Sequence, residues 1–307
     1  MKSANWLFFS PISTVERIRR SVRLRAVIMA LVLFSFSQTV SAQVTVTTAT
    51  GGTGISADKA LNGGAPTYTT LGNIVITETV KSDFATTATR IRIPAPSGWK
   101  FKAATGTISK TGSNLTLGTT SITADTVFIP FTISGTNQWD AITISGLQVI
   151  ASDGANVPNT QNLYPIITGS INGLTGTTSL GVISQAVGTR IKMVVTLPGE
   201  SFTDGTTLAS SGNTGTPTTQ TVGVAFNLLK LTVTDQFLNI DTSYKGLKVL
   251  SFASSGTSVT VSPTSINFNA GVSSTTISVS STIAQTATLT ASDGTITGPA
   301  KIGRAHV

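Results

Sequence analysis

The sequence predicts an all-β protein that consists of two consecutive β-sandwich domains. Between Gln43 and Ala300 short runs alternate polar and apolar residues with a period of two, and no 11-residue window has a helical period. Proline, glycine, asparagine and aspartate separate these runs, as turns between strands require. Residues 43–300 are also more than one sandwich of about 100 residues needs, which favours two domains.

The alternating runs locate the strongest strand predictions. In the first half Arg90–Ile93 alternates charged and apolar side chains, and Pro94, Pro96 and Gly98 then interrupt the pattern. The remaining faces predicted to be buried are Val127, Ile129, Phe131 and Ile133; Ile142 and Ile144; Leu147 and Val149; Ile191, Met193, Val195 and Leu197; and Leu229, Leu231 and Val233. We place the domain boundary at Val187–Thr189, so that the first sandwich covers 43–187 and the second covers 188–300.

The charge of the chain is concentrated at its ends. The full sequence has 20 basic and 12 acidic residues, a net charge of +8, but 43–300 contains 12 basic and 11 acidic residues, a net charge of +1. The basic composition therefore does not indicate a nucleic-acid partner. The chain has no cysteine and its one histidine is His306, which excludes disulfides, thiolate metal sites and cysteine nucleophiles.

Residues 1–42 have the pattern of a secretory signal peptide. A basic segment ending at Arg25 precedes an apolar run at 26–36, and Val40-Ser41-Ala42 provides the small residues that signal peptidase prefers. The mature chain would then begin at Gln43. A retained membrane anchor is the alternative, but the apolar run is about half of the roughly 20 residues that a span requires.

The last seven residues, 301–307, resemble the translation of a widely used short-read sequencing adapter. On this interpretation the chain is the N-terminal fragment of a longer protein whose continuation is unknown. His306 would then have no metal or catalytic role.

The second half resembles the bacterial immunoglobulin-like repeats of the invasin and filamin type. Asp235-Gln236-Phe237-Leu238-Asn239 is followed by Asp241, Tyr244 and Gly246, which is similar to the signature of those repeats. The segments 268–272 and 287–291 resemble their later strands. The resemblance implies an immunoglobulin-like second domain with a structural turn at Asp235, Asn239 and Gly246. It also implies that Asn239 takes a left-handed conformation and that Phe237 and Tyr244 fill one end of the sandwich.

The first half resembles, more loosely, an N-terminal module of large secreted surface proteins of Bacteroidetes. The segments that carry this resemblance are 54–60, 69–76 and 142–149. Such proteins are usually long, contain many β-modules and often end in a sorting domain for display on the outer surface. The resemblance implies no activity, so we predict no catalytic residue and no cofactor.

The acidic residues of the body are predicted to be structural. Most of them stand beside glycine, serine, threonine or asparagine, where turn-capping carboxylates occur, and no local spacing suggests a glycosidase pair. Asp235, Asn239 and Asp241 come nearest to a calcium site, with three oxygen donors within seven residues, but calcium needs six or more oxygen ligands. A turn cap and a weak calcium site are therefore the two interpretations of this segment.

Four basic residues alternate with apolar neighbours in two adjacent runs: Arg90, Arg92, Lys100 and Lys102. If the two strands pair, their charges share one outward face, which would attract an acidic polysaccharide. The alternative is a solvated face that protects an exposed sheet.

Two tryptophans and one short motif complete the candidates. Trp99 is predicted to be a core residue because Phe101 follows it at period two, whereas Trp139 at a strand entrance is left open between core and sugar platform. Asp125-Thr126-Val127 resembles the O-glycosylation acceptor of Bacteroidetes.

These observations predict a non-enzymatic protein that is secreted or displayed on the outer cell surface. In one interpretation the modules are spacers or adhesive units of a longer surface protein. In the other they are accessory, carbohydrate-binding modules ahead of an extracellular enzyme encoded downstream. The expected partners are a surface glycan or protein and the neighbouring modules of the same chain, and no membrane span is expected to remain.

We predict that the exported protein begins at Gln43, because Val40-Ser41-Ala42 fits the cleavage site. N-terminal sequencing of secreted material checks this prediction. A sequence starting at Met1, or well inside 44–60, would contradict it.

Overall fold

The computed structural model describes residues 43–205, 212–298 and 301–306. The predicted signal peptide and Ala42 of its cleavage site lie outside the described residues. In the described part of the chain no helix is long and apolar enough to cross a membrane.

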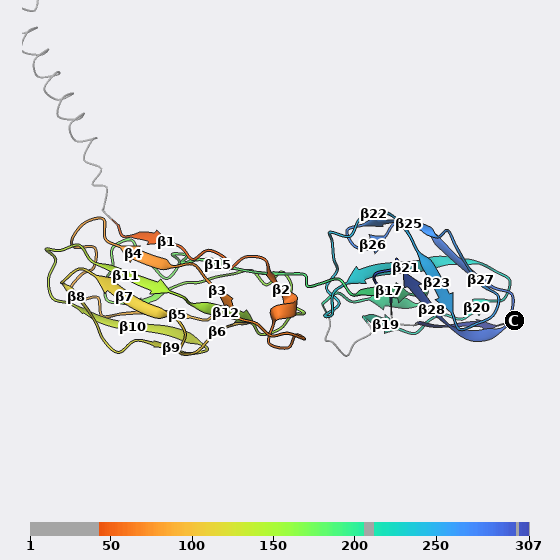
Figure 1. The fold of residues 1–307 in the computed structure, drawn as a ribbon, viewed down its shortest axis with the longest axis horizontal. Coiled ribbons are helices and arrows are strands. Elements are labelled where there is room, and N and C mark those ends of the chain that lie inside the picture. Colours follow the sequence, from red (N-terminus) through yellow and green to blue (C-terminus); the bar gives the residue numbers. More distant parts are fainter. Residues whose placement is uncertain (1–42, 206–211, 299–300, 307) are drawn as a thin grey trace, which may run out of the picture. The chain divides into compact units, whose positions relative to one another are not determined.

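The first module is built from short strands and one short helix (Figure 1). Its elements are β1 (Thr45–Thr47), β2 (Ile55–Ser56), the 3-10 helix η1 (Ala57–Lys59), β3 (Thr69–Thr70), β4 (Ile74–Thr77), β5 (Arg90–Pro94), β6 (Trp99–Phe101), β7 (Thr107–Thr111), β8 (Leu115–Leu117), β9 (Ser121–Ile122), β10 (Thr126–Ile133), β11 (Ala141–Ser145), β12 (Gln148–Ala151), β13 (Gln161–Asn162), β14 (Ile166–Thr168), β15 (Val182–Ile183) and β16 (Gln185–Ala186).

Three antiparallel sheets enclose the core of the first module. Their strand orders are β1-β4-β11-β7, then β14-β5-β10-β8 with β9 also on β10, and β3-β12-β6. The strands bury alternate residues, as their sequence period requires: Ile91 and Ile93 of β5 are buried, as are Ile142 and Ile144 of β11. β10, which pairs with β5, contributes Val127, Ile129, Phe131 and Ile133.

The second module begins at β17 and continues to the end of the described chain. Its strands are β17 (Lys192–Thr196), β18 (Glu200–Phe202), β19 (Asn213–Gly215), β20 (Gln220–Thr221), β21 (Phe226–Thr234), β22 (Gly246–Val249), β23 (Ser251–Ser254), β24 (Val259–Ser262), β25 (Ser265–Asn269), β26 (Val272–Ser273), β27 (Ile277–Ser281), β28 (Gln285–Ser292) and β29 (Lys301–His306).

Two sheets form the sandwich of the second module. One has the order β22-β25-β26-β21-β27-β24 with β17 also on β21, and the other has the order β20-β29-β28-β23. Met193, Leu231 and Phe268 of the first sheet and Leu289 of the second belong to one buried cluster. Two sheets around one core are the arrangement of an immunoglobulin-like domain, and the all-β prediction with two consecutive sandwiches is confirmed.

The two hydrophobic clusters lie on either side of the expected boundary. The first extends along the chain from Val44 to Ile183, and the second from Met193 to Ile296. One residue breaks this order, because Phe237 of the second half belongs to the first cluster. The boundary at 187–188 remains a prediction.

The adapter-like tail forms β29. This strand pairs antiparallel with β28, from Leu289 opposite Lys301 to Gln285 opposite Ala305. Ladder hydrogen bonds join main-chain groups and do not depend on side-chain identity. The origin of residues 301–307 in an adapter therefore remains a prediction.

A tyrosine and an aspartate connect the core of the second module to its last described turn. Tyr244 packs edge-to-face on Phe268 at 4.9 Å, and its hydroxyl donates to Asp293 Oδ2 at 2.8 Å. Burial alone would raise the pKa of Asp293, but hydrogen bonds from the amides of Ile296 and Thr295 and from the hydroxyls of Thr295 and Tyr244 lower it to about 2.

We expect Tyr244→Phe to destabilise the second module by about 1 kcal/mol at pH 7, because a charged acceptor loses a donor. A lowered folded-state pKa gives stability that is present above the ordinary value of 3.8 and is lost as the pH falls toward 2. The variant should therefore lose less stability than wild type across that interval. Urea unfolding at several pH values measures this, with the exposed Tyr164→Phe as control. An unchanged pH profile in Tyr244→Phe would contradict the assignment.

Candidate functional site

A buried carboxylate directly follows the long strand β21. Asp235 is fully buried, and its Oδ1 accepts hydrogen bonds from the amides of Phe237 at 2.9 Å and Asn239 at 3.0 Å. These two bonds close the turn that follows Thr234, as aspartate side chains commonly do. Leu238 takes the left-handed conformation, with φ 66°, so the expectation that Asn239 would do so is wrong. The amide of Asn239 instead faces back to Asp235.

The second oxygen of Asp235 connects the turn to the segment between the modules. Oδ2 accepts the amide of Gly188 and the side-chain Nδ2 of Asn239, both at 2.8 Å. Asn239 Nδ2 also donates to the carbonyl of Gly154 in the first module at 2.8 Å. Four N–H groups therefore satisfy one buried charge, which would be costly without partners.

A second carboxylate, from the first module, faces the same segment. Asp58 lies in η1, and its Oδ2 accepts the amide of Thr189 at 2.7 Å while its Oδ1 accepts Gln236 Nε2 at 2.9 Å. Burial acts to raise the pKa of Asp58, but these and other hydrogen bonds lower it overall. We call Asp58, Gly154, Asp235, Phe237 and Asn239 the junction cluster.

Phe237 is the apolar member of the junction cluster. Its side chain is fully buried and packs with the core of the first module, so the expectation that it fills its own sandwich is wrong. The reason is that its turn projects beyond the end of β21, where Gly154 of the first module receives the ring. A Cβ atom at Gly154 would lie 2.1 Å from Phe237 Cε2, so only glycine fits there. Tyr244, by contrast, lies in the second core.

The carboxylate oxygens proposed for calcium have other partners in the structure. Asp241 Oδ2 forms an ion pair with Arg190 Nε at 2.9 Å, and its Oδ1 accepts the amide of Ser243. Both oxygens of Asp235 already accept N–H donors. Among the described residues no group of three acidic or histidine side chains has the geometry to hold a metal ion. Gly246, with φ 82°, turns the chain into β22.

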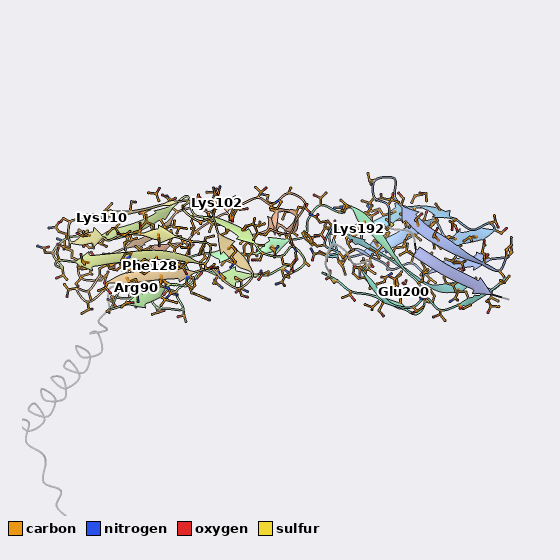
Figure 2. The ribbon with its side chains drawn as sticks, turned by 90° about the horizontal axis from the view of Figure 1, so that it is seen from below. Arg90, Lys102, Lys110, Phe128, Lys192 and Glu200 are labelled. Carbon is orange, nitrogen blue, oxygen red and sulfur yellow. The ribbon has the colours of Figure 1, made fainter. Side chains whose placement is uncertain are left out.

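The four basic residues do not share one face, because the two strands that carry them do not pair. Arg90 and Arg92 lie on β5, which pairs with β10 and β14, whereas Lys100 lies on β6, which pairs with β12. The turn at 95–98 moves the chain to another sheet instead of closing a hairpin. Lys100 forms an ion pair with Asp125, and Lys102 lies over the ring of Tyr68. In Figure 2 Arg90 lies beside Phe128, and Lys102 and Lys110 lie along the opposite edge of the module.

Three buried acids at 78–83 and 140 form a structural group that the sequence did not reveal. Glu78 accepts the amides of Phe84 and Asp140, and Asp83 accepts those of Thr79 and Val80. Burial raises the pKa of Glu78, and nearby Asp140 and Asp83 add to that effect. Asp140 in turn accepts the amide of Leu115. These carboxylates connect loops that are far apart in sequence, so no local spacing could have identified them.

The tryptophans and the glycosylation motif occupy different environments. Trp99 is a core residue, and its Nε1 donates to the carbonyl of Asn159 at 3.3 Å. Trp139 is 53% exposed. Thr126 begins β10 opposite Pro94, next to the exposed Asp125, and its glycosylation remains a prediction.

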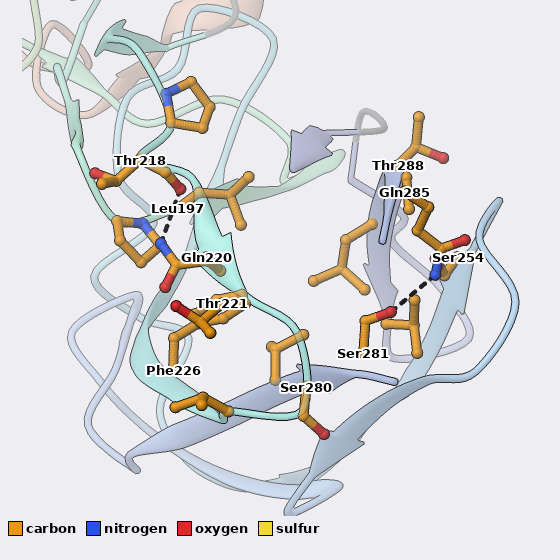
Figure 3. A pocket seen from close by; sticks show the side chains of 17 residues that line it. Leu197, Thr218, Gln220, Thr221, Phe226, Ser254, Ser280, Ser281, Gln285 and Thr288 are labelled. Atoms are coloured by element: carbon orange, nitrogen blue, oxygen red, sulfur yellow. Dashed lines mark hydrogen bonds between the residues drawn. The ribbon is translucent and has the colours of Figure 1, made fainter. Parts of the chain in front are cut away.

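An apolar pocket lies within the second module (Figure 3). Leu197, Phe226, Val279 and Leu289 line it, and Gln285 donates to Ser281 Oγ at its rim. Its volume of about 60 Å³ is the space of about two water molecules. Small-molecule sites are several times larger, so we do not assign a ligand to it.

No protein-family model and no curated protein matches the chain. Among solved structures it is similar to the Yersinia pseudotuberculosis adhesin InvE, with 13% identity and a TM-score of 0.25 over 86% of this chain and 59% of that one. The Escherichia coli adhesin FdeC matches at 13% identity and a TM-score of 0.28 over 87% of this chain and 65% of that one. The D0-D1 domain of intimin matches at 13% identity and a TM-score of 0.21 over 84% and 98%.

The chain thus spans less than two thirds of the InvE and FdeC structures that it matches. The identities and TM-scores are too low to transfer a function from these adhesins to this chain.

We expect Asp235→Ala to destabilise the protein by about 3 kcal/mol or more, because four N–H groups lose their acceptor. Asp235→Asn should cost about 1.5–3 kcal/mol, since its amide nitrogen would face a donor at one of the two oxygen positions. If only one oxygen of Asp235 accepted hydrogen bonds, Asp235→Asn would keep that acceptor and cost less. Melting temperatures with calcium and with chelator measure both effects, with Asp125→Asn as a surface control.

The calcium alternative makes a different prediction for the same variants. A metal that binds only the folded state would raise the melting temperature of wild type. A calcium-dependent rise in wild type that disappears equally in both Asp235 variants would contradict the turn cap.

Proposed function

We propose that the chain is a non-enzymatic, secreted or cell-surface β-sandwich protein and the N-terminal part of a longer multi-module adhesin or surface-structural protein. The sequence features typical of Bacteroidetes surface modules, the signal-peptide pattern and the adapter-like tail support its export and its fragment status. The observation that carries the proposal is the junction cluster.

The junction cluster restricts bending between the two modules, which is the property that a spacer requires. A surface stalk transmits position and force only when consecutive modules do not hinge freely, and contacts between domains of one chain are often small and mobile. Here an aromatic ring of the second module is buried in the core of the first. The side chain of Gln236 also donates a hydrogen bond to Asp58, and that of Asn239 donates one to the carbonyl of Gly154. Bending at the junction would expose the ring and break these bonds.

Accessory modules ahead of a downstream enzyme remain the alternative. The uninterrupted gene separates the two, because further immunoglobulin-like repeats support the surface protein and a catalytic domain supports the accessory role.

We predict that Phe237→Ala loosens the junction and destabilises the first module by about 3–5 kcal/mol, since it empties a buried aromatic position. Because the chain has no cysteine, spin labels at Thr116→Cys and Val249→Cys report one distance between the modules. The distance distribution should be narrow in the otherwise wild-type chain and broad in Phe237→Ala.

Phe252→Ala is the matched control, because Phe252 packs only against the second core. It should lower the stability of the second module and leave the distance distribution narrow. Equally broad distributions with and without Phe237 would contradict the spacer proposal.

A further inference from the structure

One outward sheet face of the first module carries charge that the fold does not compensate. In β5, β10 and β14 the residues facing the core alternate with outward residues. The register of the three strands places Arg92 between Ile166 of β14 and Phe128 of β10. In the same way it places Arg90 between Thr168 and Pro130. We call these six residues the arginine face.

The arginine face is positive without a counter-charge. The strands of its sheet, β5, β8, β9, β10 and β14, contain two arginines and no aspartate or glutamate. Within the described residues the ion pairs are Lys100 with Asp125 and Arg190 with Asp241, so neither arginine of the face takes part in one. Nothing in the folding of this sheet requires an arginine at these two outward positions.

The two guanidinium groups are held differently. Arg90 donates to Thr168 Oγ1 at 2.9 Å and lies over the ring of Phe128, with Cζ 5.8 Å from its centroid. Arg92 has a buried Nε atom with no hydrogen-bond partner. A charged group that is partly removed from water and left unpaired is unfavourable. An anion bound to its terminal nitrogens would offset that cost, and guanidinium groups bind carboxylates and related oxyanions in a bidentate manner.

The surroundings of the two arginines offer apolar and hydroxyl surface. Ile166 is 49% exposed, and Tyr164, which precedes β14, is 41% exposed. Phe128 lies opposite Arg92 on one neighbouring strand and opposite Ser121 of β9 on the other. Ser121 also lines an open hollow of about 300 Å³, which is in the size range of ligand sites.

We propose that the arginine face binds an anionic polysaccharide, with Arg90 and Arg92 on its carboxylate or sulfate groups and Phe128 against a sugar ring. Along a strand the two arginines are about 7 Å apart, so one polymer can engage both and gain from multivalency. Apolar ring surface next to hydroxyls and guanidinium groups fits a charged sugar chain better than an acidic peptide. This inference rests on the proposed adhesive function and gives it a ligand class and a site.

The test measures binding of the secreted chain to four immobilised polymers by biolayer interferometry: polygalacturonate, heparin, neutral dextran and poly-L-glutamate. The first two distinguish carboxylate from sulfate as the recognised group. We expect binding to at least one of them, no binding to dextran and much weaker binding to poly-L-glutamate.

The double variant Arg90→Gln/Arg92→Gln should weaken polysaccharide binding by about tenfold or more, since two charge-assisted contacts are lost. Phe128→Thr should weaken it without changing the net charge. The matched control is Lys102→Gln/Lys110→Gln, which removes the same charge from the other edge of the module (Figure 2) and should keep near-wild-type binding. Thermal unfolding verifies that each variant is folded.

Three results would overturn the proposal: no binding of wild type to either anionic polysaccharide, an equal loss in the lysine control, or equal binding to poly-L-glutamate. The first result would leave a solvated face that only protects the sheet, and the other two would indicate unspecific attraction of anions. None of them affects the distance measurement at the junction cluster, so this inference and the spacer proposal fail separately.

Discussion

The contacts at the junction between the two modules depend on one buried charge, the carboxylate of Asp235. A carboxylate removed from water is tolerated only when hydrogen bonds replace its hydration. Asp235 obtains two of these bonds from its own turn, one from Gly188 and one from the side chain of Asn239. Because its donors come from separate segments, the same oxygen atoms set the turn, position the linker and orient Asn239 toward the first module.

The direction of Phe237 is a consequence of that turn. The amide of Phe237 is held by Asp235, and Leu238 accepts a left-handed conformation that is uncommon for a leucine. The ring therefore leaves its own sandwich and enters the core of the first, where Gly154 leaves room for it. Strain at one residue is retained because the surrounding contacts determine the conformation. The hydrophobic cores of the two modules are consequently not independent, although each has its own sheets.

The sequence predicted the parts of this structure that depend on local period. Inward and outward positions of β5 and β10 follow from alternation, and the spacing of Trp99 from Phe101 indicates its place in the core. The expectation for Ile191 is wrong: it is 46% exposed, whereas β17 buries residues on both of its faces. Alternation does not reveal which strands become neighbours, because that choice depends on loops and on contacts between distant residues. For this reason the sequence left open whether the strand of Arg90 and Arg92 pairs with that of Lys100, and it did not reveal the contacts of Glu78, Asp83 and Asp140. The family signature located the Asp235 turn, but it could not indicate that Phe237 belongs to a neighbouring module.

Folding explains inward side chains more completely than outward ones. An inward residue of a sandwich must be apolar and of suitable volume, whereas an outward residue needs only to be compatible with a strand and with water. Many outward strand positions of the described residues meet that weak requirement with serine or threonine, which is consistent with the low charge of residues 43–300. Arg90 and Arg92 also meet it, but their sheet has no acidic side chain that would pair with them, and Phe128 adds a partly exposed ring beside them. Because the sheet supplies no counter-charge for these two arginines, the proposed counter-charge lies outside the fold, on an anionic ligand bound to the arginine face.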